Sequence, residues 1–239
     1  MSNTNTVDVY ESFPGAQVTQ DMIKTAADFF SSHYGIWGPL MGDKAGKRIR
    51  MSASKLQALV FPIELGDKCT YVRATVNGGL VGNVFACEWQ YQDRPVLWIT
   101  QLVVHSRFRG KGIAKTMLNK LRQTHIWGYG IASSHAHAIM AASAALGRHN
   151  YDPDFIKEHA EKVMAVSPSP YVHGAKVYGS LFEDVDDDAV PTVDTKLLVE
   201  HAEPVQALES VKESGADWPF GGLPDGHEFL LFINPLERW

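Results

Sequence analysis

The stretch Leu102-Val-Val-His-Ser-Arg-Phe-Arg-Gly-Lys-Gly-Ile-Ala114 carries the strongest structural signal in this 239-residue chain. It leads from an apolar strand at residues 96–104, through two glycines, into a segment whose apolar residues recur at helical spacing. The glycines permit a tight backbone turn and the close approach of a ligand. A helix that begins behind them presents unpaired N–H groups and the positive end of its dipole. The pattern therefore predicts a phosphate-binding loop at residues 109–114.

The charge distribution along the chain agrees with an anion-binding role for this segment. The whole chain contains 22 Lys and Arg and 27 Asp and Glu, for a net charge of −5. Residues 94–151 contain eight Lys and Arg but no Asp or Glu. Local positive charge in an acidic protein indicates a small polyanion site, although chance clustering on a solvated helix is the alternative. The ordinary globular composition argues against a nucleic-acid partner.

Two common phosphate-binding motifs do not fit the loop or its neighbours. A P-loop needs two glycines five positions apart, followed by Lys and then Ser or Thr. Gly46-Lys47 is followed by Arg48, and position 41 is not glycine. A dinucleotide-binding fingerprint needs a third glycine, at position 115, and an acidic residue about 20 positions further on. Position 115 is lysine and the next acidic residue is Asp152, so both motifs are excluded.

The loop resembles the Gln/Arg-x-x-Gly-x-Gly/Ala signature that binds the coenzyme A pyrophosphate in the GNAT superfamily of N-acetyltransferases. Arg109, Gly112 and Ala114 fill its three defined positions. The longer run from Leu102 is similar to the family's Leu-x-Val-x-Pro-x-x-Arg-Gly-x-Gly-x-Gly/Ala pattern, with Ser106 in place of the proline. A pattern like Trp-Pro-x-Gly before Gly-His-Glu-Phe-Leu makes the layout most similar to fungal GNAT proteins of unassigned substrate.

The resemblance implies a mixed α/β fold, in which helices flank a central, mostly antiparallel sheet and acyl-CoA binds at a splayed fourth strand. We expect one GNAT domain over residues 1–239, with an N-terminal arm at 1–17, an acyl-CoA-binding core at 65–147 and an atypical extension at 151–222. The chain's own patterns predict strands at 70–77, 80–91, 96–104, 129–133, 171–182, 196–200 and 228–233. They predict helices at 19–30, 136–146, 155–164 and 205–211.

The same resemblance implies that acetyl-CoA is the co-substrate and that the acyl acceptor is an amine. The backbone of Leu102, Val103 and Val104 would pair with the pantetheine arm. The loop would hold the pyrophosphate through Arg109, Gly110, Lys111, Gly112, Ile113 and Ala114. We expect a cationic acceptor, because the chain outside the acid-free segment is strongly acidic.

The catalytic groups follow the family pattern less closely. Many members place a carboxylate general base on the fourth strand, but residues 96–104 contain no Asp or Glu. An amine that is protonated at neutral pH must lose a proton before it attacks a thioester. The resemblance makes His227 and Glu228 the candidates for this role, because they enter the last strand and that end of the sheet often borders the acceptor pocket in the family. The alternative is a surface pair at a strand edge. Many members also place a tyrosine near the end of a later helix to protonate the leaving thiolate, and the matching position is Ser143, which alternatively only packs the helix.

Other motifs are weaker. His135-x-His137 has no third ligand nearby, and the acidic run that begins at Asp184 lacks the Gly and Glu of a calcium loop, so we predict no metal. Cys69 and Cys87 are too few for a disulfide framework. No apolar run reaches the ~20 residues that span a bilayer, so we expect a soluble cytoplasmic protein without a membrane partner. The aromatic loop at 218–224 lines the acceptor pocket in one interpretation and caps the sheet edge in the other.

The sequence therefore predicts an N-acetyltransferase that transfers acetyl from acetyl-CoA to an amine by direct attack in a ternary complex. Two alternatives stay open. One is a protein that binds acyl-CoA without turnover, as a sensor or scaffold, and the missing carboxylate on the fourth strand favours it. The other is an enzyme that modifies lysines or N-termini of proteins rather than a small molecule.

Overall fold

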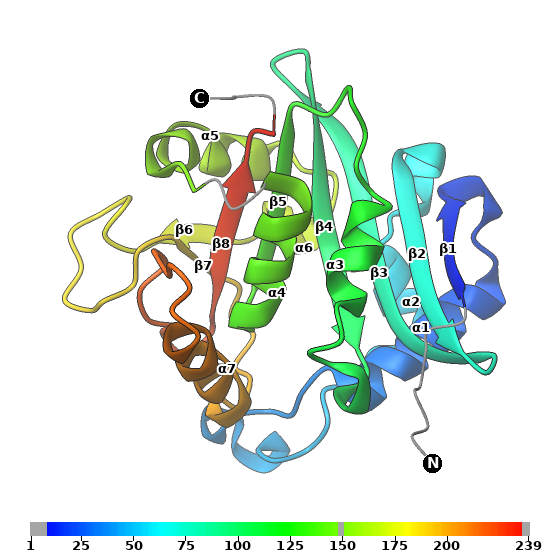
Figure 1. The fold of residues 1–239 in the computed structure, drawn as a ribbon, viewed down its shortest axis with the longest axis horizontal. Helices are drawn as coiled ribbons and strands as arrows, with labels where there is room; N and C mark the ends of the chain where they lie inside the picture. Colours follow the sequence, from blue (N-terminus) through cyan, green and yellow to red (C-terminus); the bar gives the residue numbers. More distant parts are fainter. Residues whose placement is uncertain (1–8, 148–150, 236–239) are drawn as a thin grey trace.

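One eight-stranded sheet runs through the computed structural model, which describes residues 9–147 and 151–235 (Figure 1). The strand order is β1-β2-β3-β4-β5-β8-β7-β6, and every neighbouring pair is antiparallel except β4 and β5, which are parallel. The predicted mixed α/β class with a mostly antiparallel sheet is confirmed. The strands are β1 Val9–Pro14, β2 Cys69–Val76, β3 Gly79–Tyr91, β4 Arg94–Val104, β5 Gly128–Ser133, β6 Lys176–Tyr178, β7 Thr192–Asp194 and β8 His227–Ile233.

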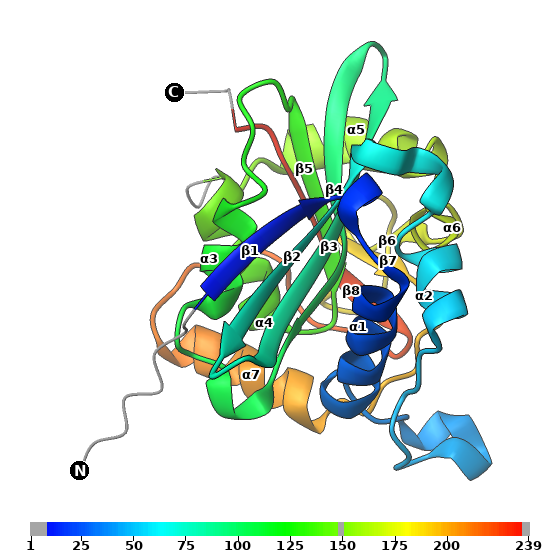
Figure 2. The ribbon, with the colours of Figure 1, turned by 90° about the vertical axis from the view of Figure 1, so that its right-hand side faces the viewer.

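Helices cover both faces of the sheet (Figure 2). One layer contains α3 and α4, whose buried Met117 and Ile139 belong to the same apolar cluster as Leu97 of β4. The other contains α1, α2 and α5, whose buried Ile23, Leu56 and Ile156 belong to a second apolar cluster. The helices are α1 Gln20–His33, α2 Ala53–Leu59, α3 Ile113–Asn119, α4 Ala136–Ala142 with a π-helical turn at Ser143–Gly147, α5 Pro153–Ala165, α6 Pro170–His173 and α7 Ala202–Glu213. Short 3₁₀ turns lie at Gly15–Gln17, Pro39–Lys44, Ile63–Lys68 and Ser106–Phe108.

The functional geometry depends on the place where β4 and β5 separate. Their pairing ends at Ile99 and Ile131, whereas β5 goes on pairing with β8 as far as Ser133. Opposite β3, Gln101 pairs with Phe85 and Ile99 with Ala86, so Thr100 is an extra residue in β4. Such a bulge bends a strand and increases its twist. The last residues of β4 therefore diverge from β5 and leave a gap in the sheet.

Several elements of the extension and the arm differ from the sequence-based expectations. Residues 171–182 do not form one strand, because Pro170–His173 is a helical turn and only Lys176–Tyr178 is extended in the sheet. Residues 196–200 are not a sheet strand, although Val199 makes a single bridge to Trp37. In the arm, residues 9–14 are strand β1, which pairs with the edge of β2. Residues 1–8 of the arm lie outside the described residues.

Two further observations concern the cysteines and the helices. Cys69 and Cys87 lie opposite each other on β2 and β3 and form a disulfide. The cysteine count alone did not predict this bond, because only the register of the two strands brings the residues together.

No helix within residues 9–147 and 151–235 is long and apolar enough to cross a membrane.

Candidate functional site

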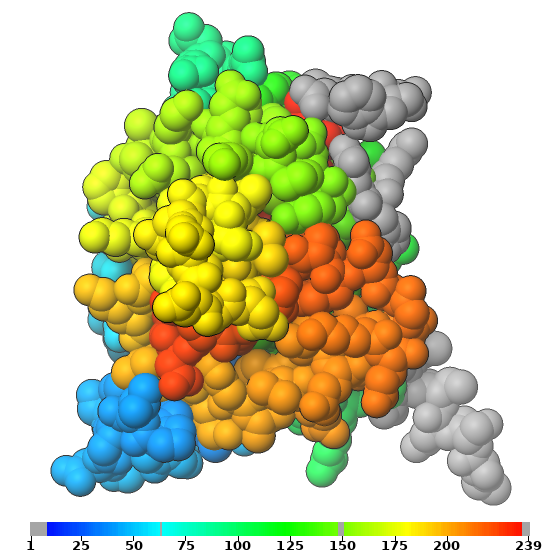
Figure 3. Space-filling model, turned by 90° about the vertical axis from the view of Figure 1, so that its left-hand side faces the viewer, coloured from blue at the N-terminus to red at the C-terminus, as the bar shows by residue number. Residues whose placement is uncertain are grey.

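A cleft of about 980 Å³ opens where β4 leaves β5. Its walls come from the ends of β4 and β5, the loop before α3, one side of α4, the end of α1 and the start of α7. Figure 3 shows the side of the molecule on which the blue segment after α1 lies beside the gold and orange segment that leads into α7. Gly38 N–H donates to the Leu198 carbonyl at 2.8 Å, which joins these two segments.

Most of the predicted cofactor residues line this cleft. The structure brings together Leu102, Val103, Val104, Arg109, Gly110, Gly112, Ile113 and Ala114. Lys111 does not belong to the lining; its ammonium lies 5.0 Å from the centre of the Phe108 ring. The loop and the end of β4 thus form one continuous wall, as the sequence pattern predicts.

The glycines of the loop adopt a backbone conformation that other residues rarely take. The φ angles of Gly110 and Gly112 are +73° and +77°, and Gly112 is the residue that precedes α3. A Cβ added at either position meets no protein atom within 4 Å. The space in front of both glycines is therefore open, and the backbone rather than crowding explains the need for glycine here.

The start of α3 offers hydrogen-bond donors to this open space. In the described part of the chain, the backbone N–H groups of Gly112, Ile113 and Ala114 have no acceptor. Unpaired N–H groups in the first turn of a helix are the usual backbone ligands of a bound anion.

Arg109 ties the loop to two other elements. Its Nε donates to the Val104 carbonyl at 3.1 Å, and its Nη2 donates to the His33 carbonyl at 2.9 Å. The remaining side of the guanidinium forms an ion pair with the Glu203 carboxylate. Burial, followed by the nearby charge of Arg48, lowers the pKa of Arg109.

Arg48 is a cleft residue that the sequence analysis missed. A bridge between Ile36 and Arg48 and the Trp37 N–H bond to the Lys47 carbonyl hold it at the cleft wall. The run from Gly42 to Arg50, which is basic and contains glycines, is the only sequence signal for this role.

Glu228 is a buried carboxylate beside the cleft, with only 2% of its surface exposed. Tyr171 donates a hydrogen bond to Oε2, and Tyr34 donates to Oε1 at 3.4 Å. Burial raises the pKa of Glu228, and hydrogen bonds from Tyr171, Thr195 and Tyr34 partly oppose the rise. Tyr34 also lines the cleft, so its phenol connects the carboxylate to the open space.

The two tyrosines stay protonated in this environment. Burial and the charge of Glu228 raise the pKa of Tyr34 and of Tyr171 well above their usual range. Each phenol is therefore a hydrogen-bond donor to the carboxylate and holds a transferable proton. The sequence analysis singled out neither residue, because both are distant from Glu228 in the chain.

The β4 bulge adds buried polar atoms next to the gap. The Thr100 hydroxyl and the Gln101 amide have no hydrogen-bond partner among the described residues, although both side chains are buried. Buried polar groups without a partner are uncommon in folded proteins. Neither residue lines the cleft, so these atoms belong to the interior beside the point where the two strands diverge.

The other two predicted catalytic residues do not line the cleft. The His227 Nδ1 lies 3.2 Å from the Thr192 hydroxyl, and its ring packs against Tyr178; burial lowers its pKa. Ser143 is buried at the end of α4, whereas the α4 residues on the cleft wall include Ala138 and Ala141. Of the three candidates, the structure brings only Glu228 within hydrogen-bond reach of a cleft residue.

The aromatic loop before β8 packs on the core rather than on the cleft. The Trp218 Nε1 donates to the Gly221 carbonyl, and the Trp218 ring lies 4.8 Å from those of Phe220 and Phe229. None of the three aromatic residues Trp218, Phe220 and Phe229 lines the cleft. This placement favours the interpretation that the loop caps the edge of the sheet.

The histidine pair at the start of α4 does line the cleft. Burial, with smaller effects of Arg109 and His137, lowers the pKa of His135 to about 4. His135 is therefore neutral near pH 7, and its Nε2 lies 3.9 Å from Glu203. Within the described residues, we find no group of three or more His, Cys, Asp or Glu that could hold a metal ion.

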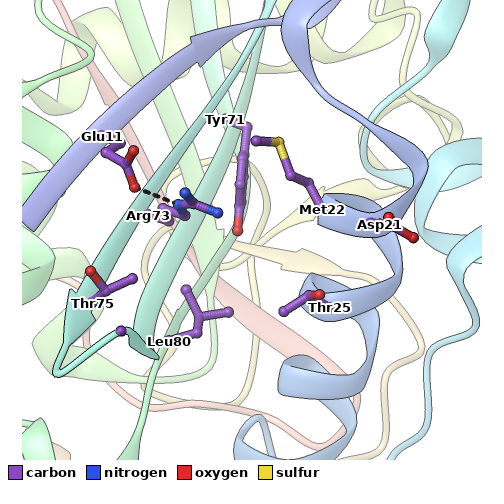
Figure 4. A pocket seen from close by; sticks show the side chains of 9 residues that line it. Glu11, Asp21, Met22, Thr25, Tyr71, Arg73, Thr75 and Leu80 are labelled. Carbon is purple, nitrogen blue, oxygen red and sulfur yellow. Dashed lines mark hydrogen bonds and ion pairs between the residues drawn. The ribbon is translucent and has the colours of Figure 1, made fainter.

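A second, smaller cavity of about 420 Å³ lies between β2 and α1 (Figure 4). Its charged side chains include Arg73, whose Nε donates to the Glu11 carboxylate at 2.7 Å, and Asp21. Tyr71 forms an aromatic wall. This cavity shares no lining residue with the cleft and contains none of the predicted site residues.

A comparison with protein-family models identifies a similarity that includes the glycine loop at residues 109–114. Residues 44–139 match the model of the Acetyltransferase (GNAT) family. No curated protein matches the chain. The matched segment includes β2 to β5, α3 and the whole glycine loop.

Solved structures with a similar arrangement are acetyltransferases of low sequence identity. One is an aminoglycoside acetyltransferase from an uncultured soil metagenomic sample, with 20% identity and a TM-score of 0.40 over 60% of this chain and 91% of that chain. Another is a possible acetyltransferase from Clostridium difficile 630, with 19% identity and a TM-score of 0.41 over 61% and 92% of the two chains. A second soil-sample aminoglycoside acetyltransferase, in complex with trehalose, has 12% identity and a TM-score of 0.42 over 60% and 90%. Residues 44–139 of this chain are therefore similar to the GNAT family of acetyltransferases.

Proposed function

We propose that this protein transfers an acyl group, most simply acetyl, from coenzyme A to an amine by direct attack in a ternary complex. The observation that carries the proposal is the continuity of the cleft. One cavity joins the glycine loop, the free edge of β4 and the phenol of Tyr34, which hydrogen-bonds to the buried Glu228. A phosphate-binding end and a proton-accepting end therefore face the same space.

The residues at the first end fit the phosphates and the pantetheine arm of coenzyme A. The pyrophosphate would accept hydrogen bonds from the N–H groups of residues 112–114 and would face Arg109 and Arg48. Beyond Ile99 the described part of β5 does not pair with β4, so the edge of Leu102 to Val104 can pair with the pantetheine amides.

The residues at the second end supply the proton transfers. The amine nitrogen bonds to the acyl carbon and the carbon–sulfur bond breaks. Because Glu228 does not line the cleft, the Tyr34 hydroxyl relays the protons: it accepts the proton that the amine loses and passes its own proton to Glu228. Tyr34 then donates a proton to the leaving thiolate and regains one from Glu228, so the free thiol and the amide are the only products. A raised pKa makes the Glu228 carboxylate a stronger base than an exposed one.

This arrangement favours an enzyme over a protein that only binds acyl-CoA. A buried carboxylate costs folding free energy, and simple cofactor binding does not require one next to the thioester. Glu200 and Glu203 also line the cleft, which is compatible with a cationic acceptor. We keep a small amine and a protein lysine or N-terminus as the two acceptor classes for the test.

The test is a thiol-release assay with acetyl-CoA against a polyamine, free lysine, a lysine-containing peptide and peptides with free N-termini. We expect release with at least one acceptor to be well above the acceptor-free rate. Binding of acetyl-CoA without release for any acceptor would support the sensor alternative. Absence of acetyl-CoA binding would contradict the proposed function.

A further inference from the structure

An acidic side chain from the extension faces the phosphate-binding loop. Residues 94–151 contain no Asp or Glu, yet the Arg109 guanidinium is paired with Glu203, on the first turn of α7. Both residues line the cleft. The carboxylate that pairs with Arg109 therefore comes from α7, which lies outside the residues that match the family model.

The pairing uses the side of Arg109 that is left for a ligand. Nε and Nη2 donate to the carbonyls of Val104 and His33, which fixes the guanidinium at the end of β4. The Glu203 carboxylate forms an ion pair with the remaining nitrogen, Nη1. Carboxylate and phosphate bind an arginine fork in the same way, so the two anions compete for this donor.

The backbone around Glu203 is held in place, so only the side chain is free to change partner. The later part of α7 packs into the core through the buried Ala207 and Val211, next to α4. The segment before α7 is tied to the end of α1, because the Glu200 N–H donates to the Ile36 carbonyl at 2.9 Å. The Glu203 side chain itself is about half exposed, at 52%.

Among the described residues, Arg109 and His135 are the basic groups within ion-pair distance of Glu203. His135 is the second contact of Glu203, at 3.9 Å, and its low pKa leaves it uncharged at neutral pH. A bound pyrophosphate would therefore meet a full negative charge at the point where it needs Arg109. Like charges at this separation repel unless one of them moves away.

We propose that Glu203 sets the affinity of the cleft for coenzyme A by acting as a tethered anion on Arg109, which the pyrophosphate must displace. This inference rests on the proposed function, because it assumes that coenzyme A is the molecule bound at the loop. It assigns to α7, a helix of the extension, a direct effect on cofactor binding. The expected consequence is that the native protein binds coenzyme A more weakly, and releases it faster, than the loop alone would allow.

The experiment measures binding rather than turnover. Calorimetric titration compares the native protein with Glu203→Gln and Glu203→Ala, using coenzyme A and pantetheine as probes. Glu209→Gln is the matched control, because Glu209 lies on the same helix, is exposed and does not line the cleft. Pantetheine is the matched ligand, because it keeps the arm that faces β4 but carries no phosphate.

We expect both Glu203 variants to bind coenzyme A about tenfold more tightly than the native protein, and pantetheine equally well. The control variant should match the native protein with both probes. Unchanged or weaker binding of coenzyme A by the Glu203 variants would overturn the inference and leave Glu203 as a residue that orients Arg109. If the Glu203 variants show that result but the native protein still binds coenzyme A, the proposed function stands and only this inference is overturned. Absence of coenzyme A binding by native and variant proteins alike would overturn both.

Discussion

The two ends of the cleft are built in different ways. The end proposed to bind phosphate comes from one continuous segment, residues 102–115, whose strand, glycines and helix follow one another in the chain. The proposed proton-accepting end combines Glu228 with two tyrosines that are distant from it in sequence. Tyr34 lies 194 residues before Glu228, and Tyr171 lies 57 residues before it. In the proposed function, anion binding thus depends on local backbone conformation, whereas proton transfer depends on tertiary contacts.

The two ends also differ in exposure. The loop glycines are open to the cleft, and Glu228 is buried behind Tyr34. Substitutions in the glycine loop should therefore change the affinity for coenzyme A, and substitutions around Glu228 should change the rate of the chemical step.

Glu228→Gln should lower kcat by at least about 10²-fold, because it removes the general base. Coenzyme A affinity should stay within about twofold, since the side chain does not line the cleft. Steady-state kinetics and calorimetric titration measure the two effects. His227→Gln is the control, because the neighbouring His227 contacts Thr192 and Tyr178 instead. Near-native kcat for Glu228→Gln would contradict the assignment.

The same carboxyl group should give a characteristic pH dependence. Its pKa is raised, so the folded protein holds this proton more tightly than the unfolded chain does. The free energy of unfolding should therefore fall as the pH rises from the unfolded to the folded pKa of Glu228, while the rate rises with ionisation. Glu228→Gln should remove both changes, which a series of thermal melts and rate measurements above pH 4.5 would detect.

Gly112→Asp should weaken coenzyme A binding by at least tenfold and abolish the thermal stabilisation that the ligand confers. The aspartate would place a side chain and a negative charge in the open space where the pyrophosphate binds, at a φ of +77°. Gly78→Asp is the matched control, because Gly78 has a φ of +73°, equally open surroundings and a position outside the cleft. Equal ligand stabilisation in both variants would show that the loop is not the phosphate site.

Tyr34→Phe should lower the highest kcat of the pH profile by about tenfold, because it removes the phenol between Glu228 and the cleft. It should also shift the profile to higher pH, because the Tyr34 hydrogen bond lowers the pKa of Glu228. Tyr171→Phe should act differently, since Tyr171 contacts Glu228 but does not line the cleft. Loss of its hydrogen bond should raise the pKa of Glu228 further and shift the rate profile to higher pH. Full pH–rate profiles of both variants distinguish the roles, and identical profiles would argue against a separate role for Tyr34.

Ser143→Ala should change kcat by less than about twofold. The serine is buried at the end of α4 and does not line the cleft, so a protonating role would require a path that the described contacts do not provide. A rate measurement with saturating acetyl-CoA is sufficient. A loss of about 10²-fold would return the role of general acid to Ser143 and weaken the case for Tyr34.

The regular elements that the sequence predicts well are those with strong local patterns. The meander β2–β3–β4 and helix α1 follow alternation, turn residues and helical spacing, and α1 begins where the Thr19 hydroxyl accepts the Met22 N–H. Strand β1 was missed because it is stabilised only by pairing with the distant β2. Strand β7 is three residues long and pairs with β8, so its own sequence contains too little information.

The cysteines illustrate the same limit. Cys69 and Cys87 are ordinary apolar positions when each strand is considered alone. Their disulfide depends on the register between β2 and β3, which places the two residues opposite each other. A count of cysteines cannot contain this information, because register is decided by the packing of whole strands.

The local sequence was sufficient to predict the conformation of residues 102–115, because glycines suited to left-handed backbone, a preceding strand and a following helix are all local properties. Glu228 became a candidate through the resemblance to the GNAT family, in which that end of the sheet often borders the acceptor pocket. Only the tertiary structure decided that Tyr34 and Tyr171 meet this carboxylate and that Glu203 meets Arg109. Hydrogen bonds and ion pairs between distant segments depend on distances of a few ångströms, and those distances exist only after the sheet and its helices have packed.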